Sequence, residues 1–351
     1  MKYLSLFSGI EAASVAWKPL GWEPIGFSEI EPFPSAVLAH HHPTTKNYGD
    51  ITKWKEWGLV PGTVDLVCAG SPCQAFSIAG LRKGLDDPRG NLALITLGLV
   101  EFLQPKWFVW ENVPGVLTSN GGRDFAAFLT ALGNIGYGWA YRVLNAEHFG
   151  LAQRRRRVWL VACRSGDWQS AAGTLFDEES LSWDHQTREC KGKETPEDAS
   201  GSAEQGDRRG CFWDGGQVTQ TLDAVLAKGQ TMPEKNRFPA VLVPESIQTP
   251  TSDICGTLRA NPGSGWRSDG TPVEAVVTTP MSVRRLSIRE CERLQGFPDD
   301  HTLIPWKGKP LDKCPSGPRY KAIGNSWAVP CARWIGERIQ LVESIKHEEK
   351  K

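Results

Sequence analysis

The sequence lacks several patterns that would place it in a specialised class of protein. Its nine cysteines include no close Cys-x-x-Cys pair and no Cys/His cluster with zinc spacing. No apolar run approaches the length of a membrane span. We therefore expect no metal site and no membrane segment. Because the odd cysteine count comes without a signal peptide, we also expect reduced thiols and a cytoplasmic protein.

The chain also lacks an excess of charge of either sign. Lys and Arg number 40, Asp and Glu number 40, and the net charge is +0. A neutral total does not exclude nucleic acid, because a local patch is what binds phosphate. Such a patch exists in the segment Gln153-Arg154-Arg155-Arg156-Arg157, followed by Arg164. The tract His40-His41-His42 is expected at a helix end or surface loop, since adjacent helical side chains point different ways.

The first half of the chain alternates strand and helix patterns, which is typical of a parallel, doubly wound α/β sheet. Strands are predicted at 3–7, 24–28, 65–69, 107–110 and 158–163, and helices from residue 12 and at 34–40, 92–102 and 125–135.

The composition changes at about residue 165, where Gly, Ser, Thr, Pro and charged residues begin to dominate. Two helices are predicted after this stretch, at 287–294 and 329–345. We predict four segments: 1–164, a smaller irregular β-rich domain at 165–283, a hinge region at 284–320, and a return to the first domain at 321–351.

A cysteine follows the third predicted strand directly. The apolar run Leu66–Ala69 ends at Gly70-Ser71-Pro72, so Cys73 stands at the carboxyl edge of the sheet. Ligands bind at that edge in open α/β sheets. A thiol held there is placed like a nucleophile, although most free cysteines are buried packing residues.

Several further motifs occur in order with Cys73, and together they resemble the DNA (cytosine-5)-methyltransferases. They are LFSGIEAA near the N-terminus, FSEIEP, GDIT, SPCQAFS continuing through Arg89 to Leu92, Glu111-Asn112-Val113, the QxRxR pattern of Gln153, Arg155 and Arg157, and near the C-terminus RRLSIRECERLQGFPDDH and IGNSWAVP. In the first motif, Glu11 and Ala12 stand where the family has its second and third glycines. The resemblance implies a Rossmann-like methyltransferase sheet.

The family binds S-adenosylmethionine, and the resemblance implies which residues of this chain would contact that cofactor. Glu29 would bind the ribose hydroxyls, Asp50 and Ile51 the adenine, and Phe7 would stack on the adenine ring. The implied cofactor residues are Phe7, Ser8, Gly9, Ile10, Glu29, Ile30, Asp50, Ile51, Pro72, Leu92, Asn325 and Ser326.

The resemblance also implies the catalytic residues Cys73, Glu111, Arg155, Arg157, Pro72 and Asn112. Cytosine C5 is a weak nucleophile, and addition of the Cys73 thiolate to C6 would activate it. A protonated Glu111 would donate to N3, Arg157 would hold O2, and Arg155 would contact phosphate or a loop. In a strand entering at Val158, Arg155 and Arg157 share one side, and Arg154 and Arg156 face the other.

The expected substrate is duplex DNA, from which the target base must be flipped. The predicted DNA contacts are Gln74, Ser77, Arg89, Gln153, Arg259 and Arg267. Arg208 and Asn261 in segment 165–283 also carry base-reading groups, and the Gln295–Pro298 turn would help hold phosphates.

We expect an enzyme of bacterial or phage type, acting as a monomer. It would be either the partner of a restriction endonuclease or an orphan methyltransferase. Two alternatives remain open: a transfer-RNA cytosine methyltransferase on the same fold, and a silent DNA-binding homologue. Intact Cys73, Glu111 and Arg157 argue against a silent protein, and only Glu11 and Ala12 favour it.

Overall fold

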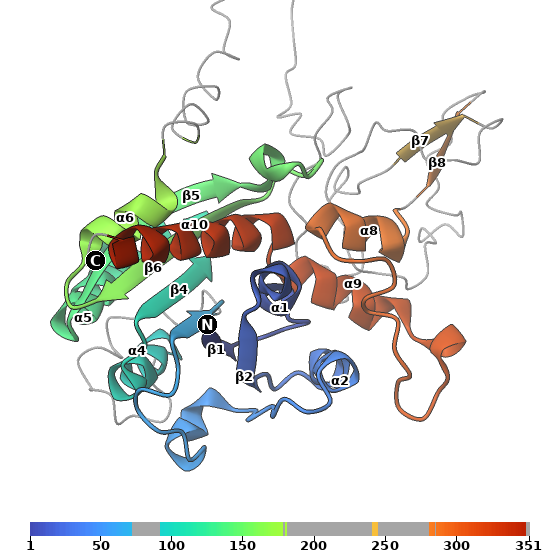
Figure 1. Cartoon of the computed structure of the whole chain (residues 1–351). Helices are drawn as coiled ribbons and strands as arrows, with labels where there is room; N and C mark the ends of the chain where they lie inside the picture. Colours follow the sequence, from blue (N-terminus) through green and yellow to red (C-terminus); the bar gives the residue numbers. More distant parts are fainter. Residues whose placement is uncertain (72–91, 178–179, 181–240, 245–280, 285, 349–351) are drawn as a thin grey trace, which may run out of the picture.

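The computed structural model describes residues 1–71, 92–177, 180, 241–244, 281–284 and 286–348, with only the backbone at 241–244 and 281–284. A six-stranded sheet in the order β2-β1-β3-β4-β6-β5 forms its centre (Figure 1). The strands are β1 (Lys2–Leu6), β2 (Glu23–Ser28), β3 (Leu66–Ala69), β4 (Trp107–Asn112), β5 (Tyr137–Asn145) and β6 (Arg156–Arg164). β1 to β4 pair in parallel, and β6 runs antiparallel to both β4 and β5. The predicted doubly wound, mostly parallel α/β sheet is confirmed.

Strict alternation along the strands builds two hydrophobic layers, one on each face of the sheet. On β4, for example, Trp107 and Val109 pack into one layer and Phe108 and Trp110 into the other. The first layer includes residues of α1 (Ala12–Trp17), α2 (Pro32–His41), α6 (Trp168–Leu175), α8 (Ile288–Gln295), α9 (Ser316–Asn325) and α10 (Val329–Glu348). The second includes residues of α4 (Leu92–Leu103) and α5 (Arg123–Asn134). The His40–His42 tract lies at the end of α2, as predicted.

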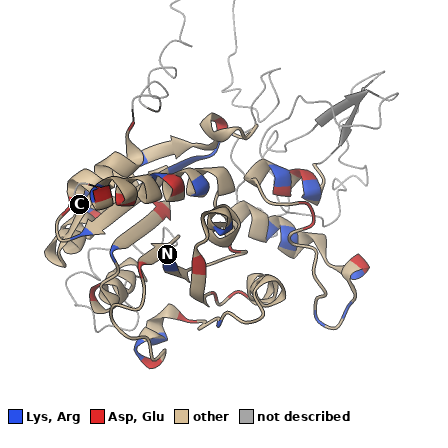
Figure 2. Cartoon of the chain, viewed as in Figure 1, with Lys and Arg blue, Asp and Glu red and all other residues tan. Residues whose placement is uncertain are grey.

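The two ends of the chain meet in the first layer. The Trp17 indole on α1 donates to the Ala332 carbonyl on α10 at 2.8 Å, across 315 positions of sequence. The Trp107 indole on β4 donates to Glu343 Oε1, also on α10, at 2.8 Å. Acidic and basic residues are interspersed along α8 and α10 (Figure 2). The C-terminal helix α10 is therefore bound both to the first helix, α1, and to the central sheet.

Among the α-helices and strands given above, three were not predicted from the sequence: β5, α6 and α9. β5 reaches β6 through the short 3₁₀ turn Ala146–Phe149. A connection without a crossover helix permits only antiparallel pairing, which explains the reversed direction of β6. α6 begins just after the predicted boundary at 164/165, yet it packs on β5, β6 and α10. We propose that the first domain extends at least to Leu175.

Most of the predicted segment 165–283 lies outside the described residues. Within it, the backbone of β7 (Val241–Pro244) pairs antiparallel with β8 (Met281–Arg284), which reaches just beyond residue 283. The four-segment division otherwise stays a prediction. Among the helices that the structure describes, none is both long and apolar enough to cross a membrane.

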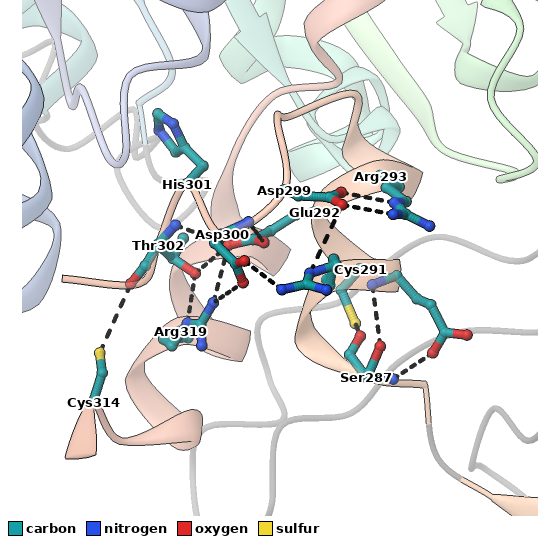
Figure 3. A network of polar contacts seen from close by, with 12 residues as sticks. Ser287, Cys291, Glu292, Arg293, Asp299, Asp300, His301, Thr302, Cys314 and Arg319 are labelled. Carbon is teal, nitrogen blue, oxygen red and sulfur yellow. Dashed lines mark hydrogen bonds and ion pairs between the residues drawn. The ribbon is translucent and has the colours of Figure 1, made fainter. Parts of the chain in front are cut away.

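A buried polar network joins α8 to α9 (Figure 3). The Glu292 side chain is fully buried, and its two oxygens accept hydrogen bonds from the backbone of Asp300 at 2.7 Å and Thr302 at 2.8 Å. The Arg319 guanidinium lies 3.4 Å from the same carboxylate. Buried charges are tolerated when they are paired in this way. The network holds the 296–302 turn against α9.

The same region contains the Gln295–Pro298 turn, which was predicted to help hold phosphates, and two of its side chains are buried. Gln295 is fully buried and Phe297 is 4% exposed. Gln295 Nε2 donates to the Ile323 carbonyl at 3.0 Å. These two side chains therefore join α8 to α9 and are not available to a phosphate on the surface.

Candidate active site

The predicted site residues that the structure describes gather at one edge of the sheet. The parallel strands β1 to β4 all end there. β6 begins at that edge because it runs in the opposite direction, and its Val158 pairs with Asn112, the last residue of β4. β1 lies between β2 and β3, so the chain order reverses beside it. Such a switch point is where open α/β sheets bind ligands.

The Glu29 carboxylate, beyond the end of β2, faces the glycine turn that follows β1. Its Oε2 accepts from the Gly9 backbone at 2.8 Å, and its Oε1 accepts from the Glu31 backbone at 2.7 Å. Burial raises the pKa of Glu29, and these two backbone hydrogen bonds oppose the increase. A Cβ added to Gly9 would meet nothing within 4 Å, and Ile30 is 71% exposed. Open space and an uncovered apolar side chain therefore lie beside a carboxylate.

These features fit the ribose and adenine of S-adenosylmethionine. A carboxylate has about four lone-pair positions, so Glu29 can accept from ribose hydroxyls while it keeps both backbone contacts. Asp50 is exposed and its Oδ1 accepts from the Thr52 backbone at 2.9 Å, which starts the turn that contains buried Ile51. Phe7 is partly buried and adopts a left-handed backbone with φ 54°.

Asn47 connects the two acidic residues, and sequence reasoning missed it. Its Oδ1 accepts from the backbones of Glu29 at 3.0 Å and Gly49 at 3.1 Å, and its Nδ2 donates to the Glu29 carbonyl at 3.0 Å. Asn47 thereby holds the end of β2 against the segment that leads to Asp50. No motif in the sequence marks this asparagine.

Three predicted cofactor residues have mainly packing roles in their side chains. The Ile10 side chain is 1% exposed. The Ile10 carbonyl accepts a hydrogen bond from His301 Nε2 at 2.9 Å. Ser8 Oγ donates to the Ser5 carbonyl at 2.9 Å. Ser326 is 6% exposed, whereas Asn325 beside it is exposed. The Ile10 side chain is therefore core, and only its backbone faces the turn.

Glu11 explains the departure from the glycine-rich pattern. Its backbone is left-handed, with φ 63° and ψ 62°, a conformation usually left to glycine. The buried carboxylate accepts from the Ser14 backbone at 3.1 Å, as the N-cap of α1, and from Ser5 Oγ at 2.8 Å. Burial raises the pKa of Glu11 to about 7, against the opposing hydrogen bonds. The glutamate thus keeps the glycine conformation and caps the helix after the turn.

We expect Glu11→Gln to remove a pH dependence of stability. In the unfolded chain Glu11 loses its proton near pH 4.5, and in the folded protein near pH 7. Stability from this group is therefore present below about pH 4.5 and is lost as the pH rises to about 7, by about 3 kcal/mol in total. Urea denaturation from pH 4 to 8.5 measures this loss. Exposed Glu23→Gln is the control. Parallel curves for wild type and Glu11→Gln would contradict the assignment.

Successive residues of β4 point to opposite faces of the sheet, with Trp110 and Asn112 on one face and Glu111 on the other. Trp110 Nε1 donates to Ser71 Oγ at 2.9 Å, and Asn112 Nδ2 donates to the Ser71 carbonyl at 3.0 Å. Both contacts lie on one face of the sheet and hold the residue that leads into Pro72 and Cys73. Glu111 points to the opposite face, as strand geometry requires. The Glu-Asn-Val motif therefore combines one anchoring and one acidic side chain.

Glu111 is buried next to the start of β6. Its Oε1 lies 3.1 Å from Arg157 Nε. Burial raises the pKa of Glu111, and the positive charges of Arg157 and Arg155 and a hydrogen bond from Trp327 oppose the increase. A buried carboxyl with a raised pKa that touches a guanidinium is typical of an acid–base site.

The arginine segment alternates as predicted, and Gln153 before it has a role that differs from the expectation. Arg154 and Arg156 are exposed, Arg155 is 2% exposed, and the Arg157 side chain is 14% exposed. Arg155 donates to the Gly324 carbonyl at 3.2 Å and the Ser326 carbonyl at 2.6 Å. Of the two contacts expected for Arg155, to phosphate or to a loop, these hydrogen bonds are the loop contact. Gln153 is fully buried and donates to the Leu294 carbonyl at 2.9 Å, so it does not face DNA here.

Most of the other predicted site residues lie outside the described part of the chain. Pro72, Cys73, Gln74, Ser77, Arg89, Arg259 and Arg267 lie outside the described residues, as do Arg208 and Asn261. Leu92 is partly buried at the start of α4. Within the described part of the chain, no three His, Cys, Asp or Glu side chains are grouped to hold a metal ion.

Comparisons with known proteins agree with this geometry. The chain is 35% identical to a DNA N-6-adenine-methyltransferase of Escherichia phage P1, over 96% of this chain and 61% of that protein. It thus spans less than two thirds of that relative's length. It is 32% identical to the type II methyltransferase M2.BsuMI of Bacillus subtilis, over 97% of this chain and 75% of the relative.

A solved structure and a family model extend the comparison. The crystal structure of the S. pombe Dnmt2 methyltransferase matches with a TM-score of 0.55 and 18% identity, over 97% of this chain and 99% of that one, which shows a shared fold. The family model described as C-5 cytosine-specific DNA methylase matches residues 1–341. This family uses S-adenosylmethionine as methyl donor. The chain therefore belongs to the C-5 cytosine-specific DNA methylase family.

Proposed function

We propose that this protein methylates C5 of a cytosine in a specific sequence of duplex DNA, through a covalent bond between Cys73 and C6. The observation that carries the proposal is the buried Glu111–Arg157 pair, at 3.1 Å, beside the Ser71 anchor of the Cys73 segment. A buried acid next to a fixed positive charge suits a ring that gains negative charge during reaction.

The reaction begins with the Cys73 thiolate, which gives its electron pair to C6 of the cytosine. The C5=C6 π electrons move towards C5 and the N3/O2 edge, where Glu111 supplies a proton to N3 and Arg157 holds O2. C5 would then form its bond to the methyl group of the bound donor, whose carbon–sulfur bond breaks with its electron pair left on sulfur. A base afterwards removes the C5 proton, the electrons re-form C5=C6, and the thiolate leaves C6. N3 gives its proton back to the Glu111 carboxylate, which restores the acid.

The methyl donor would be held by Glu29, Asp50, Phe7 and the backbone of Gly9. When bound, S-adenosylmethionine supplies an electrophilic methyl group on a sulfonium. Glu29 would orient the ribose by accepting hydrogen bonds from the two ribose hydroxyls. The exposed Ile30 would cover part of the adenine. Asn325, exposed at the end of α9, would line the second edge of the same site.

DNA is the substrate that the proposal requires, and the cytosine must leave the helix to reach Glu111. Segment 165–283 would read the sequence in the major groove. Arg259 and Arg267 within it would read bases, and Gln74, Ser77 and Arg89 would contact the DNA near Cys73. We propose that the enzyme works as a monomer in the cytoplasm, either with a cognate restriction endonuclease or alone.

The name of the phage P1 relative raises adenine N6 as an alternative target. An exocyclic amine carries its own lone pair and needs no covalent activation by a thiol. The Pro-Cys and Glu-Asn-Val motifs, with Glu111 buried against Arg157, have a role only in attack on a ring carbon. Cytosine C5 is therefore the favoured target.

Nucleoside analysis of methylated products tests this function. Duplex DNA and transfer RNA are each incubated with the protein and isotopically labelled S-adenosylmethionine, then digested and analysed by mass spectrometry. We expect label in 5-methylcytosine from DNA alone. Duplex DNA containing 5-fluorocytosine should in addition trap a covalent protein–DNA adduct, because fluorine cannot leave C5 as a proton. Label in N6-methyladenine or in transfer RNA, or normal turnover on the fluorinated DNA, would overturn the proposal.

A further inference from the structure

Trp327 occupies the junction between α9 and α10 and lies over the same face of the sheet as Glu111. Its ring packs edge-on against Trp159 at 5.0 Å and Trp17 at 6.5 Å between centroids. Trp159 is the residue of β6 that pairs directly with Glu111 of β4. The Trp327 indole is therefore held by two other tryptophans, and one of them, Trp159, lies directly beside Glu111.

The polar edge of this indole meets the carboxylate. The Trp327 side chain favours the ionised form of this carboxylate and so opposes the rise in the pKa of Glu111 that burial causes. Gly70, just after β3, lies against both groups: a Cβ there would be 2.8 Å from Trp327 Nε1 and 3.7 Å from Glu111 Oε2. Only glycine leaves room for the indole at this point. Three segments distant in sequence, which contain Gly70, Glu111 and Trp327, thus converge on one carboxyl group.

Arg155 fixes the backbone that carries Trp327. Its guanidinium binds the carbonyls of Gly324 and Ser326, the latter one residue before the tryptophan. Arg155 is itself buried, directly before β6 and two residues before Arg157. The carboxylate therefore has Arg157 at Oε1, and its other oxygen lies on the side of Gly70 and Trp327. An indole on an anchored backbone restricts the rotation of Glu111 more than a free side chain would.

We propose that Trp327 is a positioning residue for Glu111, whose indole N–H holds one carboxylate oxygen so that the carboxyl group keeps the orientation needed for proton delivery. This inference rests on the proposed role of Glu111 as the acid in cytosine methylation. It assigns to the α9–α10 junction a part in the chemical step in addition to its part in packing.

A double-mutant cycle separates positioning from packing. Single-turnover methylation of duplex DNA is measured for wild type, Trp327→Phe, Glu111→Gln and the double variant. Phenylalanine keeps an aromatic ring against Trp159 but has no N–H donor. We expect Trp327→Phe to lower the single-turnover rate about tenfold in the wild-type background, the effect of one lost hydrogen bond to an ionisable group. In the Glu111→Gln background, it should lower the rate less than about twofold.

The pH dependence gives a second readout. In the described part of the chain, the groups that face Glu111 are Arg155 just before β6, Arg157 on β6, Trp327, and Cys331 from α10. Loss of the indole donor removes a contact that stabilises the ionised carboxylate, so the decline in rate at high pH should move to higher pH. A packing defect would lower the rate equally at every pH. Trp334→Phe on α10, whose ring packs on Phe149, is the matched control and should keep the wild-type rate.

The outcomes distinguish the two proposals. If Glu111→Gln keeps the wild-type rate, the proposed function of Glu111 fails. If Glu111→Gln is slow but Trp327→Phe has an equal effect in both backgrounds and leaves the pH profile in place, only the positioning role is overturned. A smaller effect of Trp327→Phe in the Glu111→Gln background, together with a pH profile displaced to higher pH, establishes the positioning role of Trp327.

Discussion

Cys73→Ala abolishes methyl transfer to DNA while S-adenosylmethionine still binds: this is the largest effect that we expect from a single substitution. Without the thiolate, no group adds to C6, and C5 stays too weak a nucleophile to react. The proposed cofactor residues Glu29 and Asp50 lie between β2 and β3, away from the segment that contains Cys73, so we expect their contacts to remain. Labelled-methyl incorporation should fall to background, whereas calorimetry should report unchanged cofactor affinity.

A second cysteine of the same segment is the matched control for this result. Cys68 is fully buried within β3, and burial raises the pKa of its thiol well above the usual range. It therefore stays protonated and inert. We expect Cys68→Ala to keep methyl transfer, provided that circular dichroism shows a folded protein. Incorporation that persists in Cys73→Ala would show that the reaction does not pass through this thiol.

Glu111→Gln should lower the rate of methyl transfer by about 10²- to 10⁴-fold, the usual contribution of a positioned general acid. Glutamine keeps the shape of the side chain but has no acidic proton for N3. Its binding of DNA and cofactor should change little, so the loss should appear in the single-turnover rate and not in the affinities. Glu101→Gln, exposed on α4, is the control and should match wild type.

The pH profile of the wild-type enzyme follows from the same residue. Burial raises the pKa of Glu111, so the protonated form persists to higher pH than in a free glutamate. The rate is retained below this pKa and falls as the pH rises through it, because the acid form is the reactive one. The Glu111→Gln variant should lose this limb of the profile. A wild-type rate that rises steadily with pH, unaffected by the substitution, would exclude Glu111 as the proton donor.

Local patterns in the sequence predicted most of the central sheet. Strands such as Leu66–Ala69 and Trp107–Asn112 are short apolar runs bounded by turn residues, and their burial follows from their composition. β5 was missed because its polar and aromatic residues alternate without a long apolar run. The reversed direction of β6 depends on the short link that precedes it, which only the folded topology reveals.

The candidate site also has features that the sequence predicted and features that only the structure shows. Glu29, Glu111 and Arg157 were identified because motifs mark them, and the structure brings Glu111 and Arg157 together at 3.1 Å. Gln153 and Arg155 belong to an equally clear motif, yet they are buried and hold Leu294, Gly324 and Ser326. A motif records which residues the site requires and does not distinguish a side chain that meets the substrate from one that holds a neighbouring loop.

The sequence by itself determined the family, the order of strands and helices in the first half, and the chemical types of the reacting groups. These depend on side-chain periodicity and on residues close together along the chain. Only the tertiary structure decided what surrounds Glu111, since Gly70 follows β3, Arg157 lies on β6 and Trp327 lies at the α9–α10 junction. The physical reason is that burial and partner distance control the proton affinity of a carboxyl group, and both are properties of the folded chain.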